Sequence, residues 1–384
     1  MSVLRRIYTS IEECRSRYPI IALTGPRQSG KTTFLKNQYP DYTYVSLENP
    51  DVRNFALEDP NGFLKQYDRW VILDEVQRAP ELFSYLQTKV DEDQLMGQYI
   101  LSGSQNFQLI QRITQSLAGR VALFKLLPFD ISELQLGSYL SEDYADVVVK
   151  GSYPGLYDRD IPSKVFYSNY IQTYIERDLT ELVNIKDLSL FRKFIALCAG
   201  RVGQLLNLNS LALECGISQP TAKSWLSVLE TSYVVHLIQP FHQNFNKRIT
   251  KSPKLYFYDT GLVSFLLKIE NAASLKTSSY KGNLFENFII NELVKSNFHG
   301  NRMREFYFWR DHSGHEIDVL WQSHQGLELM EIKATETIKS DMFKGMDYLQ
   351  SISSTPISSK TLVHSGTFNQ SRSNGEVLSW RSIA

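Results

Sequence analysis

Short apolar runs alternate with longer amphipathic segments through the first third of the chain. Runs of this length suit strands that are buried on both faces, and segments with a 3.6-residue apolar period suit the helices between them. The alternation predicts an α/β fold on a parallel sheet. The runs lie at residues 20–23, 42–47, 70–73, 99–102 and 121–127.

The pattern becomes helical after the glycine-rich turn at residues 151–155, where we expect a helical lid. Residues 210–217 predict a short helix and a glycine turn, and Ser218 is placed to cap the helix that follows. Strands are predicted at residues 234–240 and 254–258. A helix-turn-helix followed by two strands is typical of a winged-helix region.

The last third predicts a second α/β domain. An amphipathic helix opens near Lys281, and strands, a helix and a further strand follow in an α-β-β-β-α-β order. The three consecutive strands are predicted at residues 305–309, 316–321 and 328–333, the next helix at about 338–352, and the last strand at 361–364.

Composition fits several domains. The chain has 384 residues, of which 42% are apolar, so it can bury two or three cores. We expect parts over residues 1–150, 151–270 and 271–384. Net charge is zero, so contact with nucleic acid would come from local patches. The three cysteines form no C-x-x-C pair and no apolar run is long enough to cross a bilayer, which predicts a cytoplasmic protein with no membrane partner.

The turn after the first apolar run carries the strongest chemical signal. Gly25 and Gly30 bracket four residues and precede Lys31 and Thr32, which completes the phosphate-binding pattern G-x-x-x-x-G-K-[ST]. We expect the loop backbone to surround a triphosphate, Lys31 to meet its outer phosphates and Thr32 to hold Mg²⁺. Thr33 follows at the start of the helix and is counted with the nucleotide-binding residues.

The apolar run at residues 70–73 ends in Asp74-Glu75, the arrangement that follows a phosphate loop in ATPases. We expect Asp74 to hold magnesium through water. Glu75 would orient and deprotonate the water that attacks the terminal phosphate. An isolated Asp-Glu pair is common at helix caps, but about forty residues after a phosphate loop it indicates ATP hydrolysis.

Two further positions are candidates for the same site. The run at residues 99–102 ends near Ser102 and Ser104, one of which is expected to sense the terminal phosphate. Arg120 precedes the next strand and is expected either to reach the ATP of a neighbouring subunit as a finger, in a homo-oligomer, or to cap a helix by charge.

The winged-helix region offers a DNA-binding surface. The second helix carries polar residues from Gln219 to Ser224, and the loop between the two strands is basic. Lysines there would contact phosphates while the helix enters the major groove; the alternative is that the region only packs against the ATPase. The basic residues are Lys247, Arg248, Lys251 and Lys254.

Polar residues interrupt two predicted strands of the last third. Glu331 and Lys333 flank Ile332, so the period of two places them on one face, and Asp318 can join them from the neighbouring strand. This set resembles the site of PD-(D/E)xK nucleases, which implies that acidic groups bind Mg²⁺ and the lysine positions or activates water. Glu286, in the preceding helix, is similar to a further acidic ligand of such sites. The alternative is a strand edge whose charges face solvent.

Five motifs resemble those of a large prokaryotic group of ATPases of the AAA superfamily, in the same order and at the same spacing. The resemblance covers nearly the whole chain and implies ATP rather than GTP, with a nuclease-like C-terminal domain. The motifs are Gly-Pro-Arg-Gln-x-Gly-Lys-Thr-Thr, Leu-Asp-Glu-Val-Gln, Ser-Gly-Ser, Leu-Ala-Gly-Arg-Val and Leu-Pro-Phe-x-x-x-Glu.

The sequence therefore predicts an AAA-type P-loop ATPase joined through a helical lid and winged helix to an α/β domain like that of restriction endonucleases. With ATP and Mg²⁺ as cofactors, it would act as a nucleotide-controlled, metal-dependent nuclease on DNA or RNA. The main alternative is an ATP-dependent regulatory switch whose nuclease-like domain is an inactive binding platform. A third hypothesis is that the protein is a transcription regulator that uses the winged helix alone.

Overall fold

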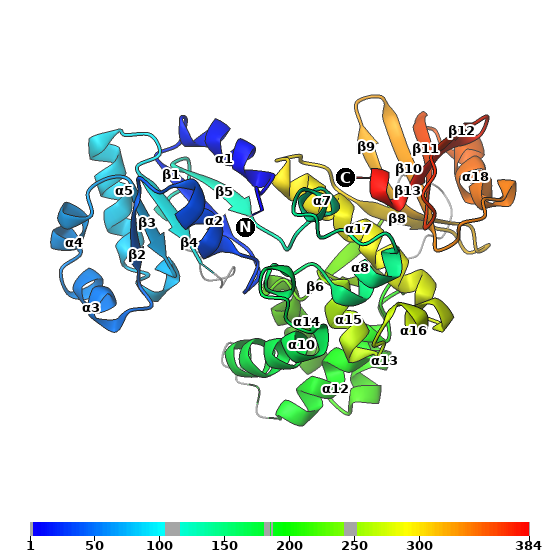
Figure 1. The fold of residues 1–384 in the computed structure, drawn as a ribbon, viewed down its shortest axis with the longest axis horizontal. Helices are drawn as coiled ribbons and strands as arrows, with labels where there is room; N and C mark the ends of the chain where they lie inside the picture. Colours follow the sequence, from blue (N-terminus) through cyan, green and yellow to red (C-terminus); the bar gives the residue numbers. More distant parts are fainter. Residues whose placement is uncertain (1–2, 104–115, 180–184, 186, 242–251, 384) are drawn as a thin grey trace. The chain divides into compact units, whose positions relative to one another are not determined.

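The computed structural model describes residues 3–103, 116–179, 185, 187–241 and 252–383 (Figure 1). Two compact units are present. Unit 1 comprises residues 1–129, 133–138 and 296–302, and unit 2 comprises residues 130–132, 139–295 and 303–384. Both later parts of the expected three-part division fall in unit 2 except for residues 296–302, and the expected boundaries at residues 150 and 270 stay predictions.

Unit 1 is built on a five-stranded sheet in which every neighbouring pair of strands is parallel, as the apolar pattern predicts. The strand order is β2-β3-β4-β1-β5. Because β1 lies between β4 and β5, the loop that leaves its carboxyl end opens at the point where the winding of the sheet reverses, which is where open α/β sheets bind ligands. The strands are β1 (Ile20–Thr24), β2 (Thr43–Ser46), β3 (Val71–Asp74), β4 (Tyr99–Ser102) and β5 (Val121–Lys125).

Apolar cores cover both faces of this sheet. Ile20 and Ala22 belong to one cluster of buried residues, while Ile21 and Leu23 belong to another. Successive side chains of a strand point to opposite faces, so an uninterrupted apolar run is what a doubly covered strand requires. The helices of unit 1 are α1 (Ile7–Arg15), α2 (Lys31–Gln38), α3 (Pro50–Glu58), α4 (Pro60–Gln66), α5 (Leu82–Asp93) and the short η1 (Val76–Arg78).

Unit 2 begins with a series of helices. Their segments are α8 (Tyr144–Lys150), α9 (Gly155–Asp158), α10 (Ser163–Tyr170), η2 (Ile171–Leu179), α12 (Leu188–Ala199), α13 (Leu208–Cys215), α14 (Gln219–Thr231), α15 (Thr260–Leu266) and α16 (Ala272–Thr277). Helix α7 (Ile131–Leu136) follows β5 in the chain, and the long helix α17 (Lys281–His299) precedes the last strands.

Helices α13 and α14 form the expected helix-turn-helix. Gly216 has a φ of +84°, a left-handed conformation that ends α13, and the Ser218 side chain caps α14 by accepting a hydrogen bond from Thr221 N at 3.2 Å. The predicted apolar face of α14 is buried, with Ala222 and Leu229 inaccessible to solvent. The assignment of a winged helix stays a prediction.

Unit 2 also contains an eight-stranded sheet in the order β12-β13-β11-β10-β9-β8-β6-β7. The strands are β6 (Val235–Pro240), β7 (Lys254–Phe257), β8 (Tyr307–Arg310), β9 (Glu316–Ser323), β10 (Gly326–Lys333), β11 (Ile357–His364), β12 (Gln370–Arg372) and β13 (Gly375–Ser379). With α17, η3 (Ser340–Phe343) and α18 (Lys344–Ile352), strands β8 to β11 follow the α-β-β-β-α-β order; β12, β13 and the final η4 (Trp380–Ser382) were not predicted.

The two strands expected as a wing extend this sheet. Strand β6 pairs in parallel with β8, with Gln239 opposite Tyr307 and Pro240 opposite Phe308, and β7 pairs antiparallel with β6. The hairpin of the middle segment and the strands of the last third therefore share one set of backbone hydrogen bonds. Within the residues that the structure describes, no helix has the length and apolarity needed to span a bilayer.

Candidate functional site

The phosphate loop of unit 1 connects β1 to α2. Gly25 has a φ of +143°, and a Cβ at this position would lie 2.2 Å from the backbone oxygen of Leu126. Gly30, with a φ of +92°, is the left-handed residue that precedes the first turn of α2. Both positions therefore require glycine, which explains the spacing found in the sequence.

Lys31 lies inside the loop and is only 7% exposed. Its Nζ donates hydrogen bonds to the backbone oxygens of Gly25 at 2.9 Å and Pro26 at 2.8 Å. Burial lowers the pKa of Lys31 to about 8, although the carboxylates of Glu75 and Asp74 act in the opposite direction. The ammonium is thus held by carbonyl groups that an anionic ligand can replace.

Thr32 and Asp74 meet across the site. The Thr32 hydroxyl donates a hydrogen bond of 2.9 Å to Asp74 Oδ2, and Tyr44, from the neighbouring strand β2, donates to the same oxygen at 2.5 Å. Asp74 Oδ1 accepts a bond of 3.2 Å from the backbone N–H of Glu75. A hydroxyl and a carboxylate in contact are ligands that Mg²⁺ prefers.

Glu75 follows β3 in a left-handed conformation with a φ of +55°. The Gln77 side chain, 8% exposed, donates a hydrogen bond of 2.5 Å from its Nε2 to Glu75 Oε2. The bond orients the carboxylate.

Three further residues were predicted to bind the nucleotide, and the structure describes two of them, Ser102 and Thr33. Ser102 lies opposite Asp74 in the β3–β4 register, and its hydroxyl is buried without a hydrogen-bond partner in the described part of the chain. Thr33 is exposed in the first turn of α2. Ser104 lies outside the described residues. The glycine cradle, the Thr32–Asp74 contact and the unpartnered Ser102 hydroxyl fit a magnesium–nucleotide complex.

Arg120 lies directly before β5, whose first residue pairs with the first residue of β1. It is therefore at the edge of the sheet opposite the phosphate loop, since the loop follows the last residue of β1. Its guanidinium makes a bidentate pair with Asp91 of α5, at 2.5 and 2.8 Å. The sequence did not predict this pair, and the two expected roles of Arg120, a finger and a helix cap, stay predictions.

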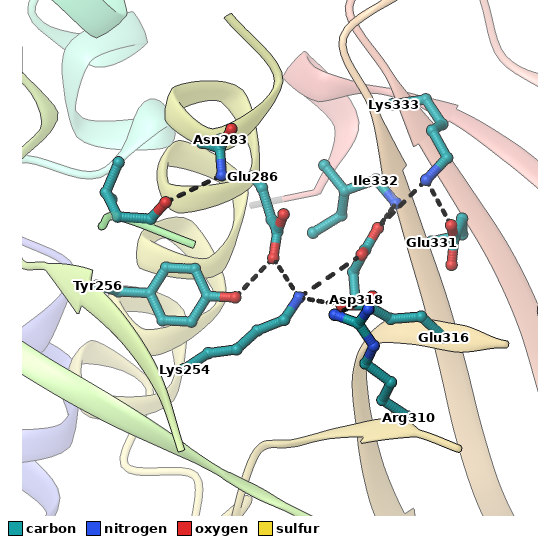
Figure 2. A network of polar contacts seen from close by, with 11 residues as sticks. Lys254, Tyr256, Asn283, Glu286, Arg310, Glu316, Asp318, Glu331, Ile332 and Lys333 are labelled. Atoms are coloured by element: carbon teal, nitrogen blue, oxygen red, sulfur yellow. Dashed lines mark hydrogen bonds and ion pairs between the residues drawn. The ribbon is translucent and has the colours of Figure 1, made fainter. Parts of the chain in front are cut away.

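A network of ion pairs lies between α17 and the sheet of unit 2 (Figure 2). Lys254 Nζ lies 3.0 Å from Glu286 Oε1 of α17, 2.5 Å from Glu316 Oε1 of β9 and 4.0 Å from Asp318 Oδ1 of the same strand. Tyr256, also in β7, donates a hydrogen bond of 2.5 Å to Glu286 Oε1. We call Lys254, Glu286, Glu316 and Asp318 the acidic cluster.

The predicted set of Asp318, Glu331 and Lys333 comes together beside this cluster. Lys333 Nζ lies 2.5 Å from Glu331 Oε1 and 3.7 Å from Asp318 Oδ2. The backbone N–H of Ile332 donates a hydrogen bond of 2.8 Å to Asp318 Oδ2. Glu331 Oε2 is buried without a hydrogen-bond partner among the described residues. The period of two thus placed the three side chains correctly, and their roles stay predictions.

Burial and mutual charge shift the titration of these groups. Burial raises the pKa of Glu286 to about 7 although Lys254 opposes the shift, and burial together with the charge of Asp318 raises the pKa of Glu331 to about 8. Burial disfavours the ammonium of Lys254, but attraction to Glu286, Asp318 and Glu316 raises its pKa above the ordinary value. Lys254 is therefore charged at any physiological pH.

The position of Lys254 corrects one expectation. From the sequence, Lys254 was expected to contact DNA phosphates together with three other basic residues of a wing. In the structure Lys254 is 3% exposed and its ammonium faces carboxylates, so it cannot meet a phosphate. Lys247, Arg248 and Lys251 lie outside the described residues. Of the cations on the proposed DNA-binding surface, the structure describes Lys223, which is exposed on α14.

The acidic cluster does not fit the divalent metal that the nuclease resemblance implies. The structure describes the three carboxylates of the cluster and the adjacent Glu331, and no three of these four side chains bring one oxygen each to within 4.8 Å of one another. The ammonium of Lys254 lies within hydrogen-bonding distance of two of these carboxylates. The carboxylates of this site are therefore already paired with a cation of the chain.

Tyr44, Gln77 and Lys254 are among the residues of the two sites whose roles were not predicted from the sequence. Tyr44 stands in a strand with ordinary alternation, and nothing in the pattern indicates that its hydroxyl contacts Asp74. Gln77 belongs to a recognised motif but received no role. Lys254 begins a predicted strand of apolar residues, and the signal that singled out Asp318, a charge within a strand, would also have identified it.

The family model that matches the first third of the chain agrees with the geometry of unit 1. Residues 17–135 match a family model described as an AAA domain, and residues 141–273 and 281–383 match two models described as domains of unknown function. The solved structure of the Walker-type ATPase of Pyrococcus abyssi is similar over 68% of this chain and 94% of that chain, with 15% identity and a TM-score of 0.42.

Curated relatives extend the match beyond the first domain. An uncharacterized protein of Haemophilus influenzae is 22% identical over 313 residues, which is 73% of this chain and 75% of that protein. An uncharacterized protein of Mycobacterium tuberculosis is 31% identical over 326 residues, which is 84% of this chain and 71% of the relative. The chain therefore belongs to the same family as this mycobacterial protein, and its N-terminal part is an AAA-type ATPase domain.

Proposed function

We propose that the AAA-type domain binds ATP with Mg²⁺ and hydrolyses the terminal phosphate. The observation that carries the proposal is the contact between the Thr32 hydroxyl and the Asp74 carboxylate beside the buried ammonium of Lys31. These are the hydroxyl, carboxylate and cation that phosphoryl transfer by P-loop enzymes uses. Thr32 and Asp74 would hold the metal ion, which when bound neutralises charge on the phosphate oxygens.

Each residue of the site would have its own role towards ATP. Lys31 would exchange the carbonyl oxygens of Gly25 and Pro26 for phosphate oxygens, and the positive end of α2 favours the same anion. Glu75, oriented by Gln77, would accept the proton of the attacking water. The buried hydroxyl of Ser102, without a described partner, supports its expected role as a sensor of the terminal phosphate.

Two variants test this proposal. Replacing Lys31 by Ala should weaken ATP binding at least tenfold, because the loop loses its buried cation. Replacing Glu75 by Gln should keep ATP affinity within about twofold while turnover falls by roughly 10² to 10⁴, the usual contribution of a general base. Binding of a fluorescent ATP analogue and release of inorganic phosphate measure the two effects. Equal turnover by wild type and Glu75→Gln would contradict the role of Glu75.

For unit 2 we propose that the nuclease-like domain is a binding platform controlled by the ATPase. The supporting observation is that a lysine of the chain contacts carboxylates that a metal-dependent nuclease would use for its metal. A nuclease acting on DNA or RNA is the second candidate, favoured by the convergence of Asp318, Glu331 and Lys333. Cleavage assays on both nucleic acids, with Mg²⁺ or Mn²⁺ and with or without ATP, decide between the two.

A further inference from the structure

We propose that Lys254 is the built-in cation of the acidic cluster and that its ammonium excludes divalent metal from Glu286, Glu316 and Asp318. The inference deepens the proposed platform role of the domain by naming the cation that fills the site. It predicts a measurable property of the purified protein, its affinity for a divalent metal. That affinity can be determined whether or not the protein binds or cleaves nucleic acid.

The first argument is the position of the ammonium. Lys254 Nζ lies between a carboxylate of α17 and two carboxylates of β9, as Figure 2 shows, at 3.0 Å from Glu286, 2.5 Å from Glu316 and 4.0 Å from Asp318. A metal bound by these three side chains would need oxygen ligands from the same directions. One volume cannot hold both cations, so metal binding requires the ammonium to leave.

The second argument is the balance of charge. Arg310 Nη1 lies 3.5 Å from Glu316 Oε2, and Lys333 Nζ lies 3.7 Å from Asp318 Oδ2. Together with Lys254, three cationic side chains thus contact the carboxylates of the cluster. Buried carboxylates without a counter-charge are strongly unfavourable, and here protein cations supply that charge. A divalent ion would add two positive charges to a site that is already compensated.

The third argument is that the backbone fixes the lysine. Lys254 is paired with Ile238 in the β6–β7 ladder and forms a further bridge with Leu205. Its side chain is 3% exposed and its ammonium lies 5.5 Å from the centre of the Phe308 ring. The pairing of β7 thus holds the buried ammonium beside the carboxylates, so Lys254 is not an exposed surface charge.

The experiment measures Mn²⁺ binding to the full chain without nucleotide, by calorimetric titration and by electron paramagnetic resonance of free Mn²⁺. All proteins carry Asp74→Asn, so that the predicted nucleotide metal site does not contribute. We expect the protein with Lys254 to show no saturable site below about millimolar Mn²⁺. Lys254→Met, which keeps an unbranched side chain of nearly the same length but removes its charge, should gain one site with at least tenfold higher affinity. Adding Asp318→Asn to Lys254→Met should abolish the gain.

Lys295→Met is the matched control, because Lys295 is also buried in unit 2 and its ammonium lies 2.8 Å from Glu292. It should gain no Mn²⁺ site. Thermal unfolding is an independent measurement. Mn²⁺ should raise the Tm of Lys254→Met and leave unchanged the Tm of the parent, which carries Asp74→Asn and keeps Lys254. ATP turnover, measured with the native Asp74, should be retained by Lys254→Met.

Two results would overturn the inference. One is tight Mn²⁺ binding by the parent that Asp318→Asn removes, and this result counts even if Lys254→Met does not fold. The other is a folded Lys254→Met that binds Mn²⁺ no better than the parent. Cleavage of nucleic acid by the native chain without metal at Asp318 would instead contradict the platform proposal and leave the inference intact.

Discussion

The hydroxyl of Tyr44 donates a hydrogen bond of 2.5 Å to Asp74 Oδ2, the oxygen that also accepts from Thr32. Tyr44 lies in β2 and Asp74 ends β3, so the bond joins side chains of adjacent strands. Burial, and then the bond to Asp74, raises the pKa of Tyr44 above its ordinary value, which keeps the hydroxyl protonated as a donor. Asp74 is thus oriented by a residue that no phosphate-loop motif contains.

Replacing Tyr44 by Phe should loosen Asp74 without changing the shape of the site. A hydrogen bond to a charged group contributes about 1.5–3 kcal/mol, so kcat/KM for ATP should fall by roughly 10-fold to 100-fold. If Tyr44 positions Asp74 for magnesium, the loss should shrink as Mg²⁺ concentration rises, and a steady-state titration of Mg²⁺ measures this. Tyr42→Phe is the control, because the Tyr42 hydroxyl bonds to the backbone oxygen of Gly97 instead. An equal loss in both variants would contradict a specific role for Tyr44.

Arg120 gives a prediction about assembly. If it acts as a finger in a neighbouring subunit, specific ATPase activity should rise with protein concentration, and Arg120→Ala should lower turnover about 10³-fold or more. Mixing Arg120→Ala with Glu75→Gln should then restore part of the activity at one class of interface. If the pair with Asp91 is its only role, Asp91→Ala and Arg120→Ala should have the same small effect on activity and stability, since exposed pairs contribute little.

The nuclease candidate makes its own prediction at Glu331 and Lys333. If the second candidate is right, Glu331→Ala and Lys333→Ala should each abolish metal-dependent cleavage and leave ATP turnover near normal, because they lie in the other compact unit. The measurement follows single-stranded and double-stranded DNA and RNA on gels. Cleavage that survives both substitutions would point to a contaminating nuclease rather than to this site.

His236 predicts how stability depends on pH. Burial lowers its pKa to about 4, from an ordinary value of 6.5, although its Nε2 is paired with Asn291 at 3.0 Å. Between these values the unfolded chain binds a proton that the folded chain does not, so the contribution is complete above pH 6.5 and is lost as pH falls towards 4. The loss from this residue amounts to about 3 kcal/mol. Urea unfolding of wild type and His236→Gln at pH 7 and pH 5 checks the sign, because the variant should lose less stability on acidification.

The sequence predicted most of the architecture because its signals are local. An apolar run such as residues 20–23 indicates a strand that is buried on both faces. The glycines at positions 25 and 30 indicate a backbone with positive φ, which few other residues adopt. The same holds for Glu331 and Lys333, whose shared face follows from the period of a strand. Each of these inferences needs only residues that are neighbours in the chain.

The relationships that the sequence did not predict join distant segments. Lys254 reaches Glu286 and Glu316 only because β6 pairs with β8, and that pairing depends on tertiary packing rather than on a local pattern. Arg120 and Asp91 are likewise 29 residues apart. The assignment of Lys254 to a solvent-exposed wing was wrong, because its carboxylate partners lie in segments far from it in the chain.

The shared sheet also limits how this chain can be divided. Strands β6 and β7 belong to the middle segment but pair into the sheet of the last third, and they carry Lys254. A fragment that begins at residue 271 would leave the edge of β8 open and would remove a cation from buried Glu286. Gene fusion or recombination at that boundary would therefore separate Lys254 from Glu286, whose charges neutralise each other. The β6–β7 hairpin and the C-terminal strands would therefore have to be inherited together, although α15, α16 and the long helix α17 separate them in the chain.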